Sequence, residues 1–422
     1  MLYREAGDFS TTYEQDSQTF PIRFDRYRYY IVLLIGFAII PFIINDYWVN
    51  AVFLPFLIYA IAAIGLNILV GYCGQVSLGT GGFMAVGAYA VYKLMTAFPE
   101  VSIIIHVILA GGVTSFVCVL FGLPSLRIKG FYLAVATLAA QFFLVWLFNR
   151  VPWFYNYSAS GQISAPERTV FGVPVTGAET APWAAYLFCL IFCFVCALVA
   201  RNLTRGMAGR KWMAIRDMDI AAEIIGVNPM RAKLSAFAVS GFFVGIAGAL
   251  FFAIYLGAVE VGEVFGINKS FLVLFMVIIG GLGSIFGSFA GAAFLVLLPV
   301  LLKNVLVGSG VEPVGVWAVV SWVMLVLGSL SAALAVMLGL RRLINRAAPW
   351  AGCLGFGALA VVLLAFYALA SGGLGWPTDL TAHLEFIIVG ALIVIFLIAE
   401  PHGLAQLWRV AKEKLRLWPF PH

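Results

Sequence analysis

The residues that could do chemistry in this chain of 422 residues are few, and they form no recognisable catalytic set. Cys189, Cys193 and Cys196 have helical spacing, but no histidine or carboxylate lies near them. We interpret them as apolar packing residues and expect neither a metal site nor a disulfide. GMAGRK at Gly206 lacks the spacing and the Ser or Thr of a nucleotide-binding loop, and His106 is interpreted as a satisfied helix-end residue. We therefore expect no enzyme, no cofactor and no ATP site.

Small polar side chains gather instead in a glycine-rich break of an apolar run, GYCGQVSLGTGGFMAVGAYA at 71–90. Irregular backbone is tolerated at membrane depth only where protein or a water-filled cavity surrounds it. A polar side chain that faced lipid would be costly, so this break favours a path for a solute. The candidate path residues here are Gly74, Gln75, Ser77, Gly79 and Thr80. Close helix packing through small residues is the alternative.

A second break, GGLGSIFGSFAGAA at 280–293, also has closely spaced glycines. Paired breaks in the two halves of a transporter point to its translocation path, and Gly283 and Ser284 are the candidates here. The break contains only two serines, Ser284 and Ser288, so close packing is the better interpretation of this stretch taken alone.

One charged stretch, AIRDMDIAAEIIGVNPMRAKL at 214–234, interrupts the apolar chain. Asp217 and Asp219 can cap or charge the start of a short helix, and Gly226 is placed to end it. Asn228 and the proline after it predict the start of another helix. The residues expected near one apolar face are Ile215, Met218, Ala222 and Ile225, with Ile224 beside them. The pattern favours docking to another protein, and a connector helix on the membrane surface is the alternative.

The elements that position these residues must lie in a membrane. The chain is 63% hydrophobic and 10% charged, with a mean hydropathy of +1.04, whereas soluble domains have about 25% charged residues. We predict an all-α, polytopic integral membrane helix bundle of about 10–12 segments, including broken helices. The expected segments are 29–45, 51–70, 82–98, 102–122, 130–149, 182–200, 235–257, 270–280, 285–302, 314–338, 350–371 and 383–399.

Basic residues predict the orientation of these segments. If both termini are cytoplasmic, 20 of the 25 Lys and Arg residues fall on the cytoplasmic side, as the positive-inside rule requires. The charged stretch then lies in the longest internal cytoplasmic loop, 201–234. We expect no cleavable signal peptide, and the pI near 9.0 needs no nucleic acid to explain it.

The same pattern predicts how the chain is divided. The pair of segments within 304–382 could be removed without changing the topology, which is typical of an inserted hairpin. The predicted regions are a cytoplasmic N-terminal segment 1–28, a core 29–303 with a coupling loop 201–234, an inserted membrane hairpin 304–382, a last transmembrane helix 383–399 and a cytoplasmic tail 400–422.

Four stretches resemble one known family in the order in which that family has them. AIRDMDIAAEIIGVNPMRAKLSAFAVSGFFVGIAGAL resembles the cytoplasmic loop and following helix of LivM-type permease subunits of branched-chain amino-acid ABC importers. GLNILVGYCGQVSLGTGGFMAVGAYA and FMVIIGGLGSIFGSFAGAA resemble the family's two glycine-rich segments, and EPHGLAQLWRVAKEKLRLWPFP is similar to its C-terminus. The resemblance covers about 30–303 and 383–420.

The resemblance implies a subunit in a bacterial inner membrane that works with partners. These are a second permease subunit, two cytoplasmic ABC ATPases and a periplasmic solute-binding protein, in contact with membrane lipid and without nucleic acid. In such importers the loop carries a docking motif for the ATPase. Ala221, Ala222 and Gly226 match its Ala-Ala and Gly positions, and Ile220 stands where a glutamate is usual. The candidate docking residues are Asp219, Ile220, Ala221, Ala222, Glu223 and Gly226.

The implied solute is a branched-chain amino acid or a related small polar or amphipathic molecule. Urea, short amides and aromatic acids stay open, because the binding protein largely sets selectivity. A stand-alone channel or facilitator for a small neutral solute such as urea is the alternative function, since the glycine-rich breaks could line a pore. Flux through the isolated chain without ATPases would favour that alternative.

Overall fold

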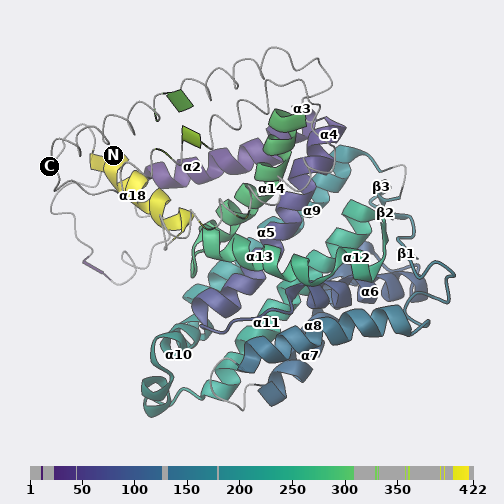
Figure 1. Ribbon diagram of the computed structural model, residues 1–422, viewed down its shortest axis with the longest axis horizontal. Coiled ribbons are helices and arrows are strands. Elements are labelled where there is room, and N and C mark those ends of the chain that lie inside the picture. Colours follow the sequence, from purple (N-terminus) through teal and green to yellow (C-terminus); the bar gives the residue numbers. More distant parts are fainter. Residues whose placement is uncertain are drawn as a thin grey trace. The chain divides into compact units, whose positions relative to one another are not determined.

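The computed structural model describes residues 11–12, 23–43, 45–125, 132–177, 180–307 and 403–417, with a few single positions between 328 and 394. The chain divides into two compact units, 1–297 with 393–422 and 298–392. The first unit contains nearly all of the described elements, and Figure 1 labels the α-helices and the strands β1 to β3.

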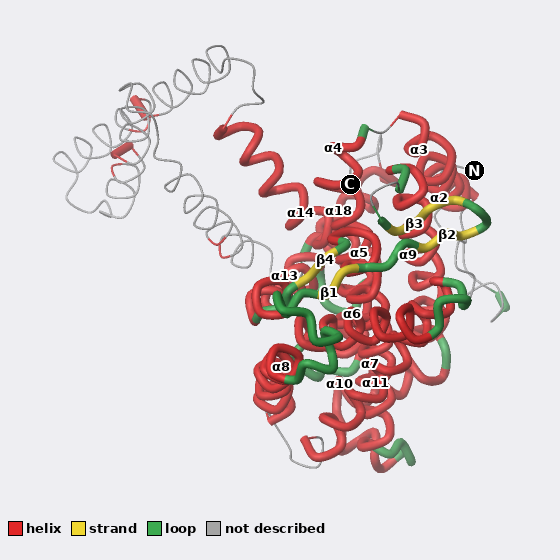
Figure 2. Tube along the Cα trace, turned by 90° about the vertical axis from the view of Figure 1, so that its right-hand side faces the viewer, coloured by secondary structure: helices red, strands yellow, loops and turns green. Residues whose placement is uncertain are grey.

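Helices make up most of the described chain, as Figure 2 shows in red. The α-helices are α2 (Arg23–Leu34), α3 (Ile40–Ile43), α4 (Asp46–Trp48), α5 (Leu54–Asn67), α6 (Thr80–Ala97), α7 (Ile103–Ser125), α8 (Tyr132–Arg150), α9 (Pro182–Arg205), α10 (Met207–Ile224), α11 (Pro229–Leu250), α12 (Val261–Val264), α13 (Ile267–Gly280), α14 (Ile285–Val307) and α18 (Leu404–Leu417). Segments with π-helical hydrogen bonding are η1 (Ile35–Ile39), η2 (Val49–Phe53), η3 (Ile68–Tyr72) and η4 (Phe251–Leu256).

Six helical segments are long and apolar enough to cross a membrane. They are Asp46–Tyr72, Ile103–Ser125, Tyr132–Arg150, Pro182–Arg205, Pro229–Leu256 and Val261–Gly280. Shorter apolar helices cover Tyr30–Phe42 and Ile285–Val300. The predicted all-α, polytopic membrane helix bundle is thereby confirmed. The expected segments 314–338, 350–371 and 383–399 lie outside the described residues except at single positions.

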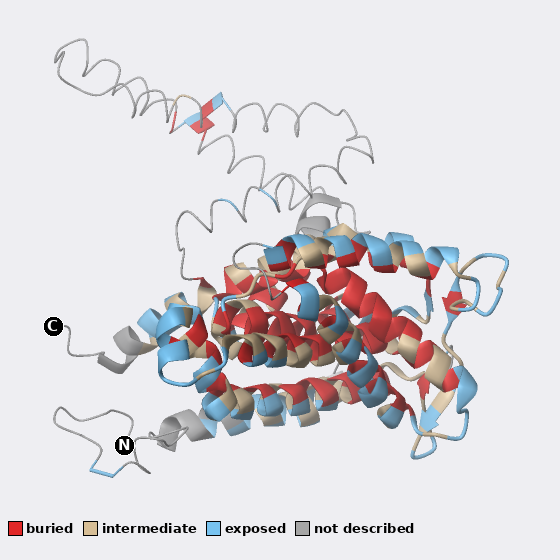
Figure 3. Ribbon diagram, turned by 90° about the horizontal axis from the view of Figure 1, so that it is seen from below, coloured by how far each residue is buried: buried red, intermediate tan, exposed pale blue. Residues whose placement is uncertain are grey.

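The first unit is built around α11, which packs against α5, α6 and α7. Small residues make these approaches close: a β-carbon at Gly248 would overlap the backbone of Met84, and one at Gly87 would overlap Gly245. Glycine at such contacts lets membrane helices gain dispersion contacts that a larger side chain would prevent. Figure 3 shows the result, with buried residues gathered between the helices and exposed residues on their outer faces.

The segment between α8 and α9 forms the described strands β1 (Ile163–Ser164), β2 (Arg168–Val170) and β3 (Val173–Thr176). β2 and β3 form an antiparallel hairpin, and β1 pairs with β4 (Ala258–Val259), which follows η4 (Figure 2). The Arg168 guanidinium donates to the carbonyl oxygens of Met95 and Pro99, at 2.5 and 2.6 Å. These hydrogen bonds attach the hairpin to the end of α6.

Candidate functional site

The charged stretch folds into the second part of α10 and is divided by a kink. Met218 has a φ of −162° and a ψ of 101°, which are extended rather than helical values. Before the kink the helix packs on the bundle, where the buried Trp212 indole donates a 2.9 Å hydrogen bond to Ser235 Oγ. After the kink a short terminal helix, 219–224, carries mostly exposed side chains. Most of the expected loop 201–234 is therefore helical.

The apolar face expected for this segment is wrong, because the extended residue at the kink resets the helical phase. Ile215 and Ala222 are buried, whereas Met218 and Ile225 are exposed. Four large apolar side chains instead form an exposed set, which we call the tip patch, and each is between 63% and 82% exposed: Met218, Ile220, Ile224 and Ile225. An apolar group of this kind rarely stays uncovered unless it meets a partner or a membrane.

The predicted end and restart of the helix are confirmed. Gly226 has a φ of +89°, and its N–H donates a 3.0 Å hydrogen bond to Glu223 O in a left-handed glycine cap. Asn228 then begins α11: its side-chain oxygen accepts a 3.1 Å hydrogen bond from Arg231 N, with Pro229 at the first helical position. Local residue types decide both features.

The six candidate docking residues lie together on the terminal helix and its cap. Ala222 is buried and Asp219 is half-buried, and the others are exposed, namely Ile220, Ala221, Glu223 and Gly226. The Asp219 carboxylate lies 3.3 Å from the Lys233 ammonium, so it already has a partner within the chain. Their role in docking stays a prediction.

The first glycine-rich break lies between η3 and α6. Its backbone leaves the helical conformation at Gly74, where φ is +70°, and is irregular up to Gly79. Ser77 and Thr80 are each 1% exposed, so protein surrounds both side chains. Gln75 is half-buried. The hydroxyl of Thr80 is buried without a hydrogen-bond partner in the described part of the chain.

Side chains from two other helices already hold the backbone N–H groups at the start of α6. Gly81 N donates to Ser270 Oγ at 2.8 Å, and Gly82 N donates to Gln141 Oε1. Ser270 Oγ also donates to Gln141 Oε1 at 3.0 Å, and Gln141 Nε2 donates to Phe265 O at 2.7 Å. The network joins α6 to α8 and α13 and satisfies donors that a helix start would otherwise leave free.

The second break, between α13 and α14, is joined to the first by Asn67 at the end of α5. Gly283 N donates to Asn67 Oδ1 at 2.9 Å. Asn67 Nδ2 donates to Ser284 O and to Ser288 Oγ, both at 2.9 Å. The two glycine-rich breaks therefore touch, and a β-carbon at Gly71 would overlap Gly283 N. Ser284 thus takes part in packing through its backbone.

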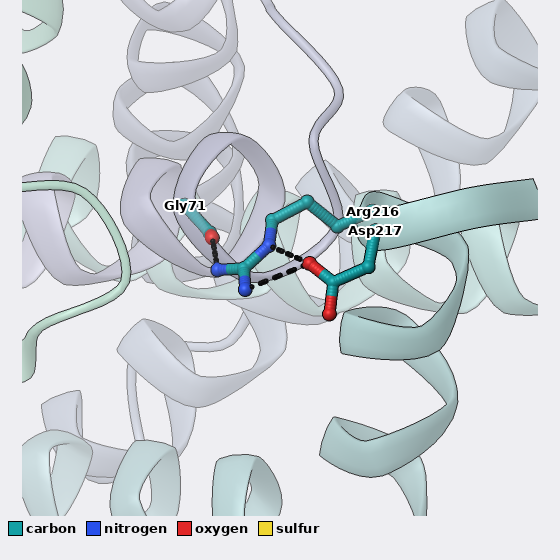
Figure 4. A network of polar contacts seen from close by, with 3 residues as sticks. All are labelled: Gly71, Arg216 and Asp217. Atoms are coloured by element: carbon teal, nitrogen blue, oxygen red, sulfur yellow. Dashed lines mark hydrogen bonds and ion pairs between the residues drawn. The ribbon is translucent and has the colours of Figure 1, made fainter.

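The place where the two breaks meet is called the junction below. Arg216 connects α10 to it, as Figure 4 shows. Its Nη1 donates to the carbonyl oxygen of Gly71 at 2.8 Å, and its Nε and Nη2 each lie 3.0 Å from Asp217 Oδ1. A β-carbon at Gly283 would lie 3.3 Å from Arg216 Nη1, and one at Gly74 would lie 3.0 Å from Arg216 Cγ. Both breaks therefore contact one side chain of the charged stretch.

The segment before α18 also meets the second break. A β-carbon at Gly403 would lie 2.6 Å from the Gly281 backbone, and the Trp408 ring stacks on Phe286 with centroids 5.8 Å apart. The C-terminal amphipathic helix is thus packed where α13 gives way to α14.

Two residues of the junction were not predicted from sequence. Asn67 is the single amide or charged residue in the run 51–70, and a lone polar residue in an apolar span is a usable signal for an interhelical contact. Arg216 belongs to the charged stretch, and nothing in the neighbouring sequence indicates that it bonds a residue 145 positions away. The described residues contain no group of three His, Cys, Asp or Glu that could hold a metal.

Comparison with known proteins places this geometry in a family. The profile of the branched-chain amino acid transport system permease component matches residues 49–330, which include every candidate path and docking residue. The match extends past 303, the predicted end of the core, into the predicted hairpin 304–382. No solved protein structure gives a significant match.

Curated relatives agree with the profile. The chain is 33% identical over 268 residues to the high-affinity branched-chain amino acid transport system permease protein LivM of Salmonella typhimurium, covering 59% of this chain and 62% of that protein. It is 32% identical to the Escherichia coli protein of the same description, covering 66% of this chain and 69% of that protein. A probable branched-chain amino acid transport permease protein LivM of Methanocaldococcus jannaschii is 25% identical, covering 64% and 86%. The chain therefore belongs to the branched-chain amino acid transport system permease family.

Proposed function

We propose that this chain is the permease subunit of an ATP-driven importer that carries a branched-chain amino acid or a related small amphipathic solute. The observation that carries the proposal is the contact of Arg216, in the partly exposed α10, with the Gly71 carbonyl in the first glycine-rich break. A force applied to α10 would reach the break through this side chain. The printed descriptions of the LivM relatives support the choice of solute.

The energy source in this proposal is a cytoplasmic ATPase that docks on the tip patch. The chain has no nucleotide-binding loop, so ATP must act from a partner. The exposed side chains of Met218, Ile220 and Ile224 offer apolar area, which is the main source of affinity at protein interfaces. Ile220 would contribute apolar contact where a glutamate is usual in the docking motif.

The kink at Met218 separates a part of α10 that would move with the ATPase from a part held by the bundle. Trp212 anchors the earlier part, while Arg216 lies two residues before the kink and reaches the breaks. Interfaces packed through glycine have few intermediate arrangements, so a small displacement favours a switch between two states. We propose that ATP-driven displacement of the terminal helix opens and closes the junction of the breaks.

The proposed translocation path runs beside the two breaks. Gln75, Ser77 and Thr80 supply polar atoms from the first break, and the unpartnered Thr80 hydroxyl could hydrogen-bond to a solute or water when the junction opens. Gly74, Gly79, Gly283 and Ser284 supply backbone. In this proposal the bonds of Asn67 hold the junction closed in the resting protein.

The complete transporter would contain a second permease subunit, two ATPase subunits and a periplasmic binding protein that delivers the solute. The chain would cross a bacterial inner membrane with both termini in the cytoplasm, as its basic residues predict. In that orientation α10 faces the ATPases and the β2–β3 hairpin faces the binding protein.

The test is co-purification of the ATPases with a tagged chain, followed by uptake of labelled leucine into proteoliposomes. Ile224→Asp and Ile225→Asp should each remove the ATPases, because an acidic group in an apolar interface is costly to desolvate. Phe171→Asp is the matched control, since Phe171 is 98% exposed on the β2–β3 hairpin. Full ATPase binding by both isoleucine variants, or leucine flux through the chain alone, contradicts the proposal.

A further inference from the structure

Lys269 lies in an aromatic cage within the candidate membrane span Val261–Gly280. Its Nζ donates a 2.6 Å hydrogen bond to the Tyr59 hydroxyl. The same nitrogen lies 5.3 Å from the Tyr59 ring centroid and 4.9 Å from the Phe251 ring centroid. Tyr59 and Phe251 are 6% and 3% exposed, so the ammonium faces the interior of the first unit.

The cage leaves this cation incompletely satisfied. An ammonium has three donors, and only the bond to Tyr59 is formed among the described residues, where no ion pair includes Lys269. The two rings offset part of the cost of removing the charge from water. An ionisable residue inside a membrane segment is costly and generally marks a site that binds or conducts a solute.

The residue that follows Lys269 contacts the first glycine-rich break, while the Lys269 ammonium itself contacts α5. The next residue, Ser270, accepts the Gly81 N–H at the start of α6. Tyr59 is on α5, the helix that ends at Asn67 and holds the second break. Lys269 therefore bonds α5 directly and is adjacent in the chain to the contact of α13 with α6.

We propose that Lys269 binds the carboxylate of the transported solute. The inference rests on the proposed function, because it names the group that would recognise an amino acid in the path. A carboxylate can accept the two unused donors in charge-assisted hydrogen bonds. The rings of Tyr59, Phe251 and Tyr255 supply an apolar wall that suits an aliphatic side chain, since Phe251 also packs on Tyr255 at 5.2 Å between centroids.

A purely structural cation–π contact is the competing explanation, and Lys93 provides the comparison within the same chain. Lys93 Nζ lies 4.3 Å from the Trp153 ring centroid and donates to the side-chain oxygen of Asn156. It is thus also held by an aromatic ring, but outside the span of α13 and with an amide oxygen as its partner. If aromatic packing alone explains why Lys269 is buried, solute should change the reactivity of the two lysine amines to the same extent.

The first experiment measures protection of the amine in the wild-type complex. Reductive methylation of Lys269 and Lys93 is followed by peptide mass spectrometry with leucine, with leucinamide or with neither. Leucine and leucinamide both carry the amine that consumes reagent, and they differ in the carboxylate. We expect leucine to slow methylation of Lys269 several-fold, leucinamide to have little effect, and Lys93 to react equally in all three samples. Equal protection by both compounds, or by neither, overturns the inference without any transport measurement.

The second experiment measures leucine imported per ATP hydrolysed in proteoliposomes that contain the whole complex and the binding protein. Lys269→Met keeps an unbranched side chain, one atom shorter and without the charge, and we expect this ratio to fall about ten-fold while ATP hydrolysis continues. Lys269→Arg should keep more of the ratio, and Lys93→Met should keep all of it. An unchanged ratio in Lys269→Met overturns the inference. If the wild-type complex takes up no leucine, the proposed function is contradicted. The methylation result then decides the role of Lys269.

Discussion

The Arg216 guanidinium donates a 2.8 Å hydrogen bond to the Gly71 carbonyl oxygen. One residue belongs to the charged helix α10 and the other to the first glycine-rich break, and they are 145 positions apart in the sequence. The same guanidinium is held in place by Asp217. A single side chain thus links the segment predicted to meet a partner with the segment predicted to border the solute path.

We expect Arg216→Ala to lower ATP-driven uptake about ten-fold, because a charge-assisted bond of this kind is worth about 1.5–3 kcal/mol. Its effect on the thermal unfolding midpoint should be small, since the Arg216 side chain is 39% exposed and exposed ion pairs contribute little stability. Arg216→Lys should restore only part of the uptake, because an ammonium cannot reproduce the fork of contacts to two groups. Arg210→Ala, an exposed change on the same helix, is the control. Similar losses in Arg210→Ala and Arg216→Ala would count against a specific role.

Asn67→Leu should destabilise the chain by about 1–3 kcal/mol, because it leaves buried partners without a hydrogen bond. The lost bonds include those to Gly283 N and Ser288 Oγ. Ser288→Ala removes only one of them and should cost less. Thermal unfolding in detergent or nanodiscs measures both changes. Equal stability of the wild type and Asn67→Leu would show that the junction is not held by this side chain.

Gly226→Val should abolish co-purification of the ATPases, whereas Gly226→Asn should keep most of it. Gly226 has a φ of +89°, and a β-carbon there meets nothing within 4 Å. The cost of the valine substitution therefore comes from the positive φ of the backbone, which asparagine tolerates and a β-branched residue does not. Circular dichroism of both variants checks that the bundle stays folded. If the valine variant bound the ATPases as well as the wild type, the glycine cap would not be needed for docking.

The Cys73 thiol should react very slowly with iodoacetamide in the resting protein. Burial raises the pKa of the Cys73 thiol to about 12, although the nearby Lys233 ammonium opposes the rise. A raised pKa keeps the thiol protonated at neutral pH, so reactivity should appear only as pH rises toward that value. At pH 8 the thiolate fraction should be about a thousand-fold below that of a free cysteine.

Peptide mass spectrometry reports this reaction at Cys73 separately from the other cysteines. The exposed variant Ala221→Cys is the positive control and should label quickly. Faster labelling of Cys73 when ATP and the ATPases are present would indicate that the first break opens. Rapid labelling in the resting protein would contradict the closed junction.

Features that depend on neighbouring residues could be predicted well. Gly226 ends a helix because glycine adopts a positive φ at low cost, and Asn228 and Pro229 begin the next one through local capping chemistry. The membrane class follows from composition in the same way, because an apolar helix of sufficient length needs no distant partner to satisfy its backbone.

The tip patch shows where periodicity failed. A regular helix from Ile215 to Ile225 predicts one apolar face, but the extended backbone of Met218 rotates the residues after it. Nothing in the residue type of Met218 requires that conformation. The packing of Trp212 on one side of the kink and the cap at Gly226 on the other set the two halves independently.

Residue types and their order are enough to predict a membrane helix bundle, two glycine-rich breaks in its helices and a glycine cap at the end of one charged segment. Composition and short-range hydrogen bonding govern these features. Three contacts could not be predicted in this way: Asn67 joins the two breaks, Arg216 reaches them, and Lys269 has an aromatic cage. The physical reason is that these contacts join residues 145 to 216 positions apart, and they form only after close packing of the helices has brought their polar groups together.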